Sequence, residues 1–400
     1  MPNNWKTYKL EQVATLQRGF DLPNTKRTDG KYPVIAASGF STWHNEFKVK
    51  GPGVVTGRSG TLGQVNFVLN DFWPLNTSLW VKDFHGNDER FIYYFLKTLN
   101  FEEYNSGTSV PTLNRNDVHK LEVTIPALQE QQSIASVLSA IDDKIENNLA
   151  INKTLEEMAM TLYKHWLVDF GPFQEGEFFA SELGMIPKGW EVKRLGELAD
   201  IGSSKRIFYD EYVAEGIPFY RGKEVIELSK GKSISSELFI SEQKFNEIKA
   251  RFNIPTKGDI LISSVGTIGV SWLVDGFEEF YFKDGNLTWI KNYKTFLKGE
   301  YLHLWLNSEN GKNQIDGEVI GSTQKALTIS SLRNFKILFP NEEVYKQIGN
   351  EFIDYYEQRQ LNLIEIKTLT QLRDTILPRL ISGTVRLKEF RETVEEVVKY

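Results

Sequence analysis

Two short glycine-rich segments carry the side chains with the clearest capacity for chemistry. Residues 56–61 and 263–267 lie between predicted strands and combine glycine with serine, threonine or arginine. Small residues let another molecule approach the backbone closely, and hydroxyl groups can bond phosphate oxygens or base edges. The same composition also suits a tight hairpin turn that binds nothing. The candidate contacts in these segments are Arg58, Ser59, Thr61, Ser263 and Thr267.

A second pair of polar segments precedes an apolar strand in each half of the chain. Residues 106–112 and 321–325 carry hydroxyl groups, and the second of these segments adds an amide and a basic group. In the major groove of DNA, arginine and lysine pair with guanine, and glutamine pairs with adenine. Most surface cations make no such contact, so these assignments are hypotheses. Together with basic residues in polar segments at comparable places, they are Thr108, Ser109, Thr323, Gln324, Lys325, Lys26, Arg27, Lys205, Arg206, Arg221 and Lys223.

Recognised catalytic motifs are missing from the sequence. None of the 13 prolines adjoins another, which excludes the Asn-Pro-Pro or Asp-Pro-Pro motif of amino-methyltransferases. Pro52 stands where a nucleotide-binding P-loop ending at Ser59 would need its first glycine. The five histidines show no paired metal-ligand spacing, and there is no cysteine for a structural zinc site. The sequence therefore predicts no catalytic residue and no metal site in this chain.

The negative charge of the chain is concentrated outside two large segments. The net charge is −6, although contacts to phosphate need lysine and arginine. Residues 1–128 hold 14 basic and 12 acidic residues, and residues 188–342 hold 21 of each. The rest of the chain holds 12 basic and 20 acidic residues. Two nearly neutral segments predict weak non-specific affinity for nucleic acid, so we infer that a partner protein supplies part of the affinity.

Composition places the chain among folded proteins built from more than one unit. Its 400 residues are too many for one compact core, and 40% of them are hydrophobic. The absence of cysteine excludes disulfides and fits a reducing cytoplasm. No run of eighteen apolar residues and no hydrophobic signal region occur. We therefore expect a cytoplasmic protein that neither enters a secretory route nor spans a membrane.

An internal repeat organises the elements that must position the candidate residues. Residues 5–16 align with residues 190–201 at an offset of 185. The glycines and threonine at 60, 61 and 63 align with those at 266, 267 and 269, and Pro126 aligns with Pro340. The growing offset indicates that the second half carries an insertion. Each half is interpreted as a strand-rich domain followed by one helix.

The helix in each half shows the spacing of a coiled coil. After Pro126, seam positions from Ile134 to Trp166 alternate in steps of four and three, and the same register recurs from Ile348 to Leu380. The pattern predicts helices over about 130–166 and 343–380, each roughly 55 Å long. Arg359 and Arg373 occupy seam positions and should weaken the second helix's seam. Two separate surface helices, each packed on its own domain, remain the alternative.

Asn148 and Asn362 occupy equivalent positions near the midpoints of the two helices. If a pseudo-two-fold axis relates the repeats, the helices are antiparallel and equivalent residues meet where the axis crosses. Asn148 should then lie close to Asn362 and fix the register at some cost in stability. Two unrelated asparagines facing solvent are the alternative.

These patterns together predict an α+β fold of two strand-rich domains in pseudo-two-fold repeat, separated by two long antiparallel coiled-coil helices. The predicted segments are domain 1 at 1–128, a central spacer helix at 129–168, a linker at 169–187, domain 2 at 188–342, a C-terminal spacer helix at 343–381 and a tail at 382–400.

Three segments carry a resemblance to a known family. IPKGWEVKRLGELADI at 186–201, LYKHWLVDFGPF at 162–173 and LRDTILPRLISGTVRL at 372–387 resemble signature segments of the specificity subunits of type I restriction-modification systems. With the repeat, this resemblance covers nearly the whole chain. It implies two target recognition domains, each reading one half of a split, asymmetric site on double-stranded DNA. The bases read cannot be inferred, because the variable loops contain no family motif.

The resemblance also implies partners and cofactors outside this chain. The two helices would dock two modification subunits, which carry S-adenosylmethionine and methylate adenine N6. Restriction subunits would join for translocation and cleavage that depend on ATP and Mg. The specificity subunit itself would hold no cofactor and perform no catalysis.

Two functions from other classes remain open. A stand-alone DNA-modifying enzyme would need a cofactor or metal site that the motif search does not find. A structural coiled-coil adaptor would explain the helices but not two large domains with matching frameworks and hydroxyl-rich loops. Assays of the purified chain test the first alternative, and DNA binding by the assembled complex tests the second.

Overall fold

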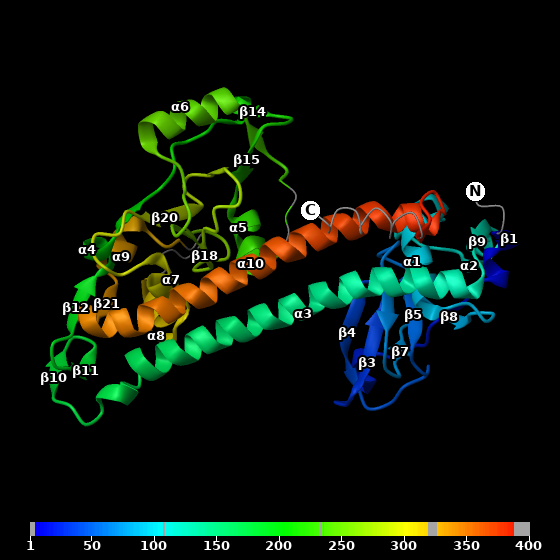
Figure 1. The fold of residues 1–400 in the computed structure, drawn as a ribbon, viewed down its shortest axis with the longest axis horizontal. Coiled ribbons are helices and arrows are strands. Elements are labelled where there is room, and N and C mark those ends of the chain that lie inside the picture. The colour runs from blue at the N-terminus through cyan, green and yellow to red at the C-terminus, as the bar shows by residue number, and fades with distance from the viewer. Residues whose placement is uncertain (1–4, 107–108, 233, 235, 319–325, 388–400) are drawn as a thin grey trace. The chain divides into compact units, whose positions relative to one another are not determined.

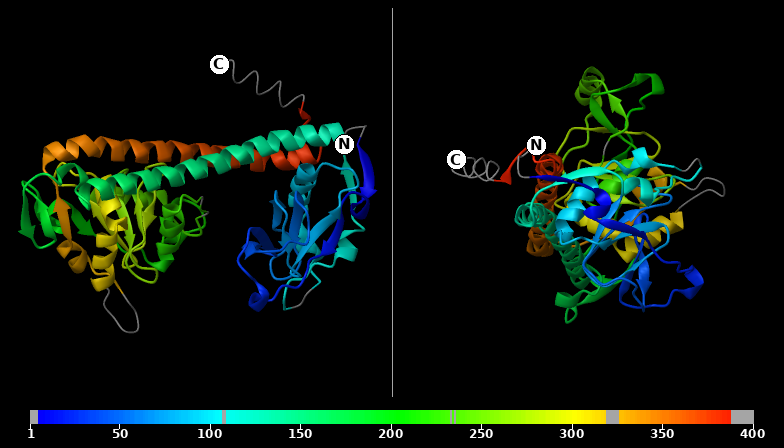
Figure 2. Two further views of the ribbon diagram at one scale, coloured as in Figure 1. Left: turned by 90° about the horizontal axis from the view of Figure 1, so that it is seen from below. Right: turned by 90° about the vertical axis from the view of Figure 1, so that its right-hand side faces the viewer.

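The chain forms two compact units in the computed structural model, which describes residues 5–106, 109–232, 234, 236–318 and 326–387 (Figure 1). The first unit comprises Met1–Glu146 with Thr368–Tyr400, and the second comprises Asn147–Lys367. Two helices of 40 residues each, α3 (Leu128–Leu167) and α10 (Glu342–Ile381), contribute to both units. Within each unit taken by itself, the strands lie to one side of its portion of the two helices (Figure 2).

The first unit is built on an antiparallel sheet of order β2-β8-β5-β6. A second sheet has the order β4-β3-β7, and β1 pairs with β9. Strand β5 is buried along its whole length because it is covered on both faces, which its apolar sequence GVVTG permits. The elements are β1 (Lys6–Lys9), η1 (Leu10–Gln12), β2 (Thr15–Arg18), η2 (Asn24–Lys26), β3 (Tyr32–Ala36), β4 (Gly39–His44), β5 (Gly53–Gly57), β6 (Val65–Val68), β7 (Trp73–Pro74), β8 (Ser78–Asp83), α1 (Glu89–Thr98), η3 (Phe101–Tyr104), α2 (Arg115–Val118) and β9 (Glu122–Ile125).

The second unit repeats the central sheet and the β1-β9 pair of this framework, and it adds strands β10, β11 and β14. Its antiparallel sheet has the order β13-β20-β17-β18, and β12 pairs with β21 as β1 pairs with β9. The predicted repeat is therefore confirmed at the level of sheet topology. The elements are η4 (Gly171–Phe173), β10 (Phe178–Ser181), β11 (Gly184–Pro187), β12 (Glu191–Arg194), α4 (Leu195–Leu198), β13 (Asp200–Gly202), η5 (Tyr209–Glu211), β14 (Tyr212–Val213), β15 (Ile217–Tyr220), α5 (Gly222–Ser229), β16 (Phe239–Ile240), α6 (Glu242–Phe252), β17 (Ile260–Ser263), β18 (Ser271–Leu273), β19 (Tyr281–Phe282), β20 (Leu287–Lys291), α7 (Gly299–Asn307), α8 (Glu309–Glu318), α9 (Ile329–Asn334) and β21 (Lys336–Phe339).

The insertion predicted for the second half contains helices α5 and α6. Both lie between β15 and β17, whereas the first unit passes from β3 to β5 through the hairpin strand β4. Ser241 caps α6, because its side chain accepts a hydrogen bond from the backbone N–H of Lys244. Phe245 and Ile248 of α6 pack with Phe219 and Tyr281 in a small separate core. The insertion therefore extends the unit without changing the order of its central sheet.

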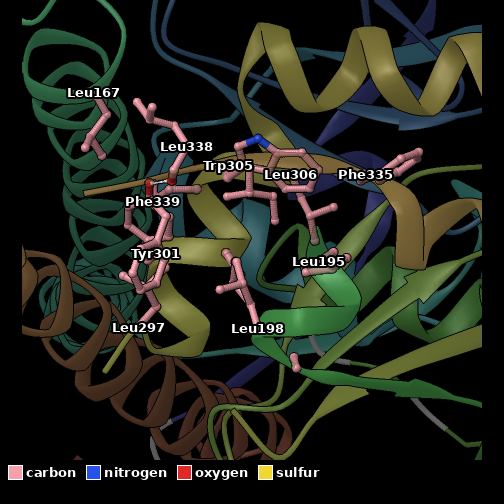
Figure 3. Close-up of a cluster of buried hydrophobic side chains, with 14 of the residues drawn as sticks. Leu167, Leu195, Leu198, Leu297, Tyr301, Trp305, Leu306, Phe335, Leu338 and Phe339 are labelled. Carbon is pink, nitrogen blue, oxygen red and sulfur yellow. Dashed lines mark hydrogen bonds between the residues drawn. The ribbon is translucent and has the colours of Figure 1, made fainter. Parts of the chain in front are cut away.

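The largest core lies in the second unit, where the end of α3 meets the framework. Leu167 of α3 packs with residues from α4, α7 and β21 (Figure 3). Tyr301 of α7 is fully buried, and its hydroxyl donates to the carbonyl oxygen of Leu338 at 2.7 Å. Because these buried side chains come from both the helix and the domain, this end of α3 is fixed to the second unit.

The two long helices run antiparallel within the second unit. Asn148 Nδ2 donates to Glu365 Oε2 at 2.8 Å, and Arg359 Nε donates to Glu156 Oε1 at 2.6 Å. Residue numbers thus rise along α3 while those of its partners fall along α10. This antiparallel pairing and the predicted apolar seam agree, because most seam positions, including Leu138 at 0% exposure, are buried.

The pairing of the central asparagines differs from the sequence-based expectation. Asn148 and Asn362 are both buried, but Asn362 Nδ2 donates to Asn152 Oδ1 at 2.8 Å. Asn148 donates to Glu365 instead. The observed register is therefore shifted by one helical turn from the predicted one. An apolar seam tolerates such a shift, so the polar pairs determine which register forms.

The two seam arginines do not interrupt the helix pair. Arg359 pairs with Glu156 in the second unit, and Arg373 Nη1 pairs with Asp142 Oδ1 at 2.9 Å in the first. Each guanidinium meets a carboxylate on the opposite helix, so no seam cation is left without a counter-charge. The expectation that these arginines weaken the seam omitted their acidic partners on α3.

Candidate nucleic-acid interface

In the first unit, the two polar segments singled out from the sequence lie against each other. The N–H of Gly60 donates to the carbonyl oxygen of Pro111 at 2.9 Å, and the N–H of Leu113 donates to that of Arg58 at 2.8 Å. An isolated bridge joins Ser59 to Thr112. Residues separated by some fifty positions in sequence therefore form one surface at the end of strand β5.

In the second unit, the glycine-rich turn pairs with residues 326 and 327, which align with residues 112 and 113 of the first unit. The N–H of Leu327 donates to the carbonyl oxygen of Ser264 at 2.9 Å, and Val265 forms a bridge with Ala326. Gly60 and Gly266 have φ angles of +91° and +78°, a left-handed conformation that a side chain would strain. The aligned glycines thus mark the same turn in both repeats.

A hollow of about 440 Å³ lies beside the joined segments of the first unit. Three of its lining residues are arginines, and none carries a carboxylate. Arg58 was a sequence-based candidate, whereas Arg18 and Arg115 were not. Arg18 occupies the position two residues after the buried Leu16 of β2, and an arginine that continues an inward-facing strand pattern is the signal that could have identified it. The lining residues are Arg18, Arg58, Leu79, Ser106, Thr112, Leu113, Asn114, Arg115 and Asn116.

The electrostatics of this hollow favour a ligand with negative or acceptor groups. Burial and the neighbouring charge of Arg18 lower the pKa of Arg58 below its ordinary value. Arg58 Nη1 donates to the carbonyl oxygen of Asn76 at 3.3 Å, which holds the side chain in place. Among the residues that the structure describes, Arg18, Arg58 and Arg115 form no ion pair with a carboxylate.

The second unit has a different hollow, of about 490 Å³, beside its glycine-rich turn. Arg206 Nε pairs with Asp284 Oδ2 at 2.8 Å, so the charge of this arginine is already compensated. Tyr209 lines the same hollow and is 89% exposed, and Lys283 and Asn286 complete its polar surface. The two hollows therefore offer different groups to a ligand.

The other predicted cations have varied surroundings. Lys26 is exposed, and Arg27 donates to the Leu22 carbonyl and to Ser41 Oγ at 3.3 and 3.2 Å. Lys205 lies over the ring of Phe252, with its Nζ 4.8 Å from the ring centroid. Each of these side chains remains accessible at the surface of its own unit.

Arg221 and Lys223 are engaged by acidic residues. Arg221 pairs with Glu224 and Glu237 at 2.7 and 2.6 Å, and Lys223 pairs with Glu237 at 2.7 Å. The hydrogen bonds to Glu224 and Glu237 raise the pKa of Arg221, and the bond to Glu237 raises that of Lys223. Contact with phosphate would require these carboxylates to be displaced, so the pair is a weaker candidate than Arg58.

The predicted hydroxyl contacts divide into exposed and buried positions. Thr61, Ser109 and Thr267 are exposed, and Ser59 is half-buried. Ser263 is 1% exposed and its hydroxyl accepts a hydrogen bond from the N–H of Val270, so it stabilises the turn instead of facing a ligand. Four further candidates lie outside the described residues: Thr108, Thr323, Gln324 and Lys325.

Neither a metal site nor a membrane-spanning helix is found in the described ranges. No group of three or more histidine, aspartate or glutamate side chains there is arranged to hold a metal ion. None of the described helices is long and apolar enough to cross a membrane.

Comparison with known proteins identifies the family. The model for the type I restriction modification DNA specificity domain matches residues 2–157 and 187–373, one match for each repeat. The chain therefore belongs to this family, which confirms the resemblance carried by its signature segments.

Individual relatives agree over most of the chain. It is 27% identical to the type I restriction enzyme MjaIX specificity subunit of Methanocaldococcus jannaschii, over 97% of this chain and 95% of the relative. It is 24% identical to the HindI specificity subunit of Haemophilus influenzae, over 81% and 84%. A crystal structure of a type I restriction-modification S subunit from M. genitalium has the same fold, with a TM-score of 0.62, 20% identity and coverage of 95% and 97%.

Proposed function

We propose that this chain is the DNA-reading subunit of a type I restriction-modification complex and that each unit reads one half of a bipartite, asymmetric site. The observation that carries the proposal is the repeated framework: in each unit the glycine-rich turn lies beside a sheet of the same order and pairs with equivalent backbone residues, 112 and 113 in the first unit and 326 and 327 in the second. The hollows beside them differ in their charged and aromatic groups. Two units with the same framework but different surface groups are suited to reading two different half-sites.

The partners are DNA and the other subunits of the system, and the helix pair supplies a docking surface for two modification subunits. In the second unit, Ile151 and Met158 on α3 are 38% and 46% exposed. Their spacing of seven residues puts them on one face of the helix. Leu361 on α10 is 59% exposed. Exposed apolar side chains at helical spacing are suited to cover by partner helices.

Catalysis belongs to the partners in this proposal. The modification subunits would carry S-adenosylmethionine, and the restriction subunits would use ATP and Mg in the cytoplasm. The chain lacks the sequence motifs for methyl transfer and nucleotide hydrolysis. Its own contribution is to choose the site and to hold the modification subunits there.

The test combines the chain with its cognate modification subunits and maps methylated adenines in a DNA library. The complex should methylate one bipartite site, whereas the chain alone and the modification subunits alone should not. Turnover by the purified chain with S-adenosylmethionine or magnesium would support a stand-alone enzyme. A complex that assembles but methylates without sequence preference would support a structural adaptor.

A further inference from the structure

The arginine hollow of the first unit is positioned by three adjacent strands. Arg18 on β2 is paired with Leu79 on β8, and Thr56 on β5 is paired with Leu79 from the other side. Arg58 follows Thr56 by two residues, so it continues the same side of β5. Both arginines line the hollow together with the buried Leu79.

Arg58 is held at both its backbone and its side chain. Its N–H donates to the carbonyl oxygen of Thr77 at 2.9 Å, and its own carbonyl accepts from Leu113. Its Nη1 donates to the carbonyl oxygen of Asn76. A guanidinium has five N–H donors, so this single bond orients the plane and leaves donors for a ligand. A side chain fixed in this way loses little conformational entropy on binding.

The charge in the hollow is uncompensated within the described residues. Arg206 and Arg221 in the second unit meet carboxylates, but the eight residues that line the hollow with Arg58 include none. Arg18 acts on Arg58 as a like charge. A ligand that brings hydrogen-bond acceptors would relieve this repulsion, and the surrounding amide and hydroxyl groups could contact its neighbours.

We propose that Arg58, supported by Arg18, reads a guanine in the half-site of the first unit; this inference rests on the function proposed above. In the major groove, guanine presents the two acceptors O6 and N7, which match an arginine fork. A phosphate contact needs only a cation near the backbone, and exposed side chains such as Lys26 can provide it. The half-buried, doubly fixed Arg58 has the rigidity that base discrimination requires.

The first test is a methylation map made with the assembled complex. The half-site read by the first unit, identified by exchanging residues 1–128 for those of a relative, should contain a required guanine. Arg58→Lys keeps the charge but loses the fork, so discrimination at that one position should fall by about tenfold or more. Arg90→Lys on α1 is the matched control, and it should leave the map unchanged because Arg90 lies against Phe67 and Asp143.

The second test uses the wild-type complex and altered DNA, so it does not depend on the folding of a variant. Replacing the required guanine by 7-deazaguanine removes N7 and should lower methylation about tenfold, whereas inosine keeps O6 and N7 and should be methylated normally. A half-site without guanine, full activity on 7-deazaguanine, or uniform weakening by Arg58→Lys without a change in preference would overturn the inference alone. Failure of the wild-type complex to methylate a bipartite site would instead overturn the proposed function.

Discussion

The charged residues in the helix seam show how individual side chains determine the geometry of the helix pair. Asp142 on α3 accepts from Arg373 on α10, and it also accepts from the hydroxyl of Tyr94 at 2.7 Å. Tyr94 is 1% exposed, so its hydroxyl depends on this carboxylate. One aspartate thus joins the globular body of the first unit to both helices that belong to it.

Asp142→Ala should lower the free energy of unfolding of the first unit by about 2 kcal/mol, because it leaves the buried Tyr94 hydroxyl without its acceptor and leaves Arg373 with Asp374 as its carboxylate partner. The matched control is Asp143→Ala. Asp143 is 65% exposed and lies 3.6 Å from Arg90, so its loss should cost less than about 0.5 kcal/mol. Urea titration followed by circular dichroism measures both. Equal effects of the two substitutions would contradict the role assigned to Asp142.

His303 makes the stability of the second unit depend on pH. Burial lowers the pKa of His303 to about 4; the hydrogen bond to the Ser271 carbonyl opposes this shift and the charge of Arg359 adds to it. The ring is therefore neutral in the folded unit, with Nδ1 2.6 Å from the Tyr356 hydroxyl. Between pH 6.5 and 4, His303 is therefore protonated in the unfolded chain but neutral in the folded unit.

The unfolding free energy of the second unit should therefore fall by up to about 3 kcal/mol as pH decreases from 6.5 to 4, and this contribution should be constant above pH 6.5. His303→Gln should remove most of that slope. His165→Gln replaces an exposed histidine on α3 and should retain it. Urea midpoints measured from pH 4 to 8 separate these outcomes, and an unchanged slope in His303→Gln would show that other groups cause the pH dependence.

At the scale of elements, the sequence predicted the strands, helices and turns whose formation depends mainly on neighbouring residues. The strand-rich character of each half and both long helices were predicted correctly, since such patterns depend only on neighbouring residues. The aligned glycines predicted matching turns for the same reason. Strand alternation puts Arg18 on the same side of β2 as Leu16, but its place near Arg58 could not be predicted, because strand β8, more than sixty residues later in the sequence, lies between β2 and β5.

The helix register was also beyond local patterns. Sliding antiparallel helices by one turn keeps apolar residues in the seam, so periodicity alone does not choose among registers. The choice is made by pairs such as Asn152 with Asn362 and Glu156 with Arg359. Each of these pairs joins a residue of α3 to a residue of α10, so the pattern of one helix alone does not predict it.

A matched heptad deletion tests whether the helix pair sets the distance between half-sites. Deleting residues 145–151 and 363–369 removes Asn148 together with its partner Glu365 and preserves the polar pairs on either side. Each helix shortens by about 10 Å, which corresponds to about three base pairs of DNA. The assembled complex should methylate sites whose half-sites are closer by that amount, with unchanged half-site sequences.

A control deletion separates length from register. Deleting 145–151 with 359–365 shortens the pair equally but removes Asn362 while Asn152 remains buried. This variant should show the same shift in spacing with a lower urea midpoint than the matched deletion. An active, matched variant that kept the original spacing would show that something other than the helices sets the distance.

At the scale of the whole molecule, each unit has its own sheet, its own glycine-rich turn and its own hollow. Cores that do not depend on each other allow one unit to change its surface while the other is preserved. The family match to both repeats is consistent with such independence. Recognition of two half-sites by one chain then follows from duplication of a framework followed by divergence of its loops.

The measurement that tests this account most directly is a methylation map after exchange of one unit's reading surface. Residues 1–128 are replaced by the equivalent region of a relative, and the complex with the modification subunits is used to map methylated adenines. The account predicts that one half of the recognised site changes to that of the relative, while the other half and the adenine methylation activity stay the same. A change in both halves, or in neither, would contradict the assignment of one half-site to each unit.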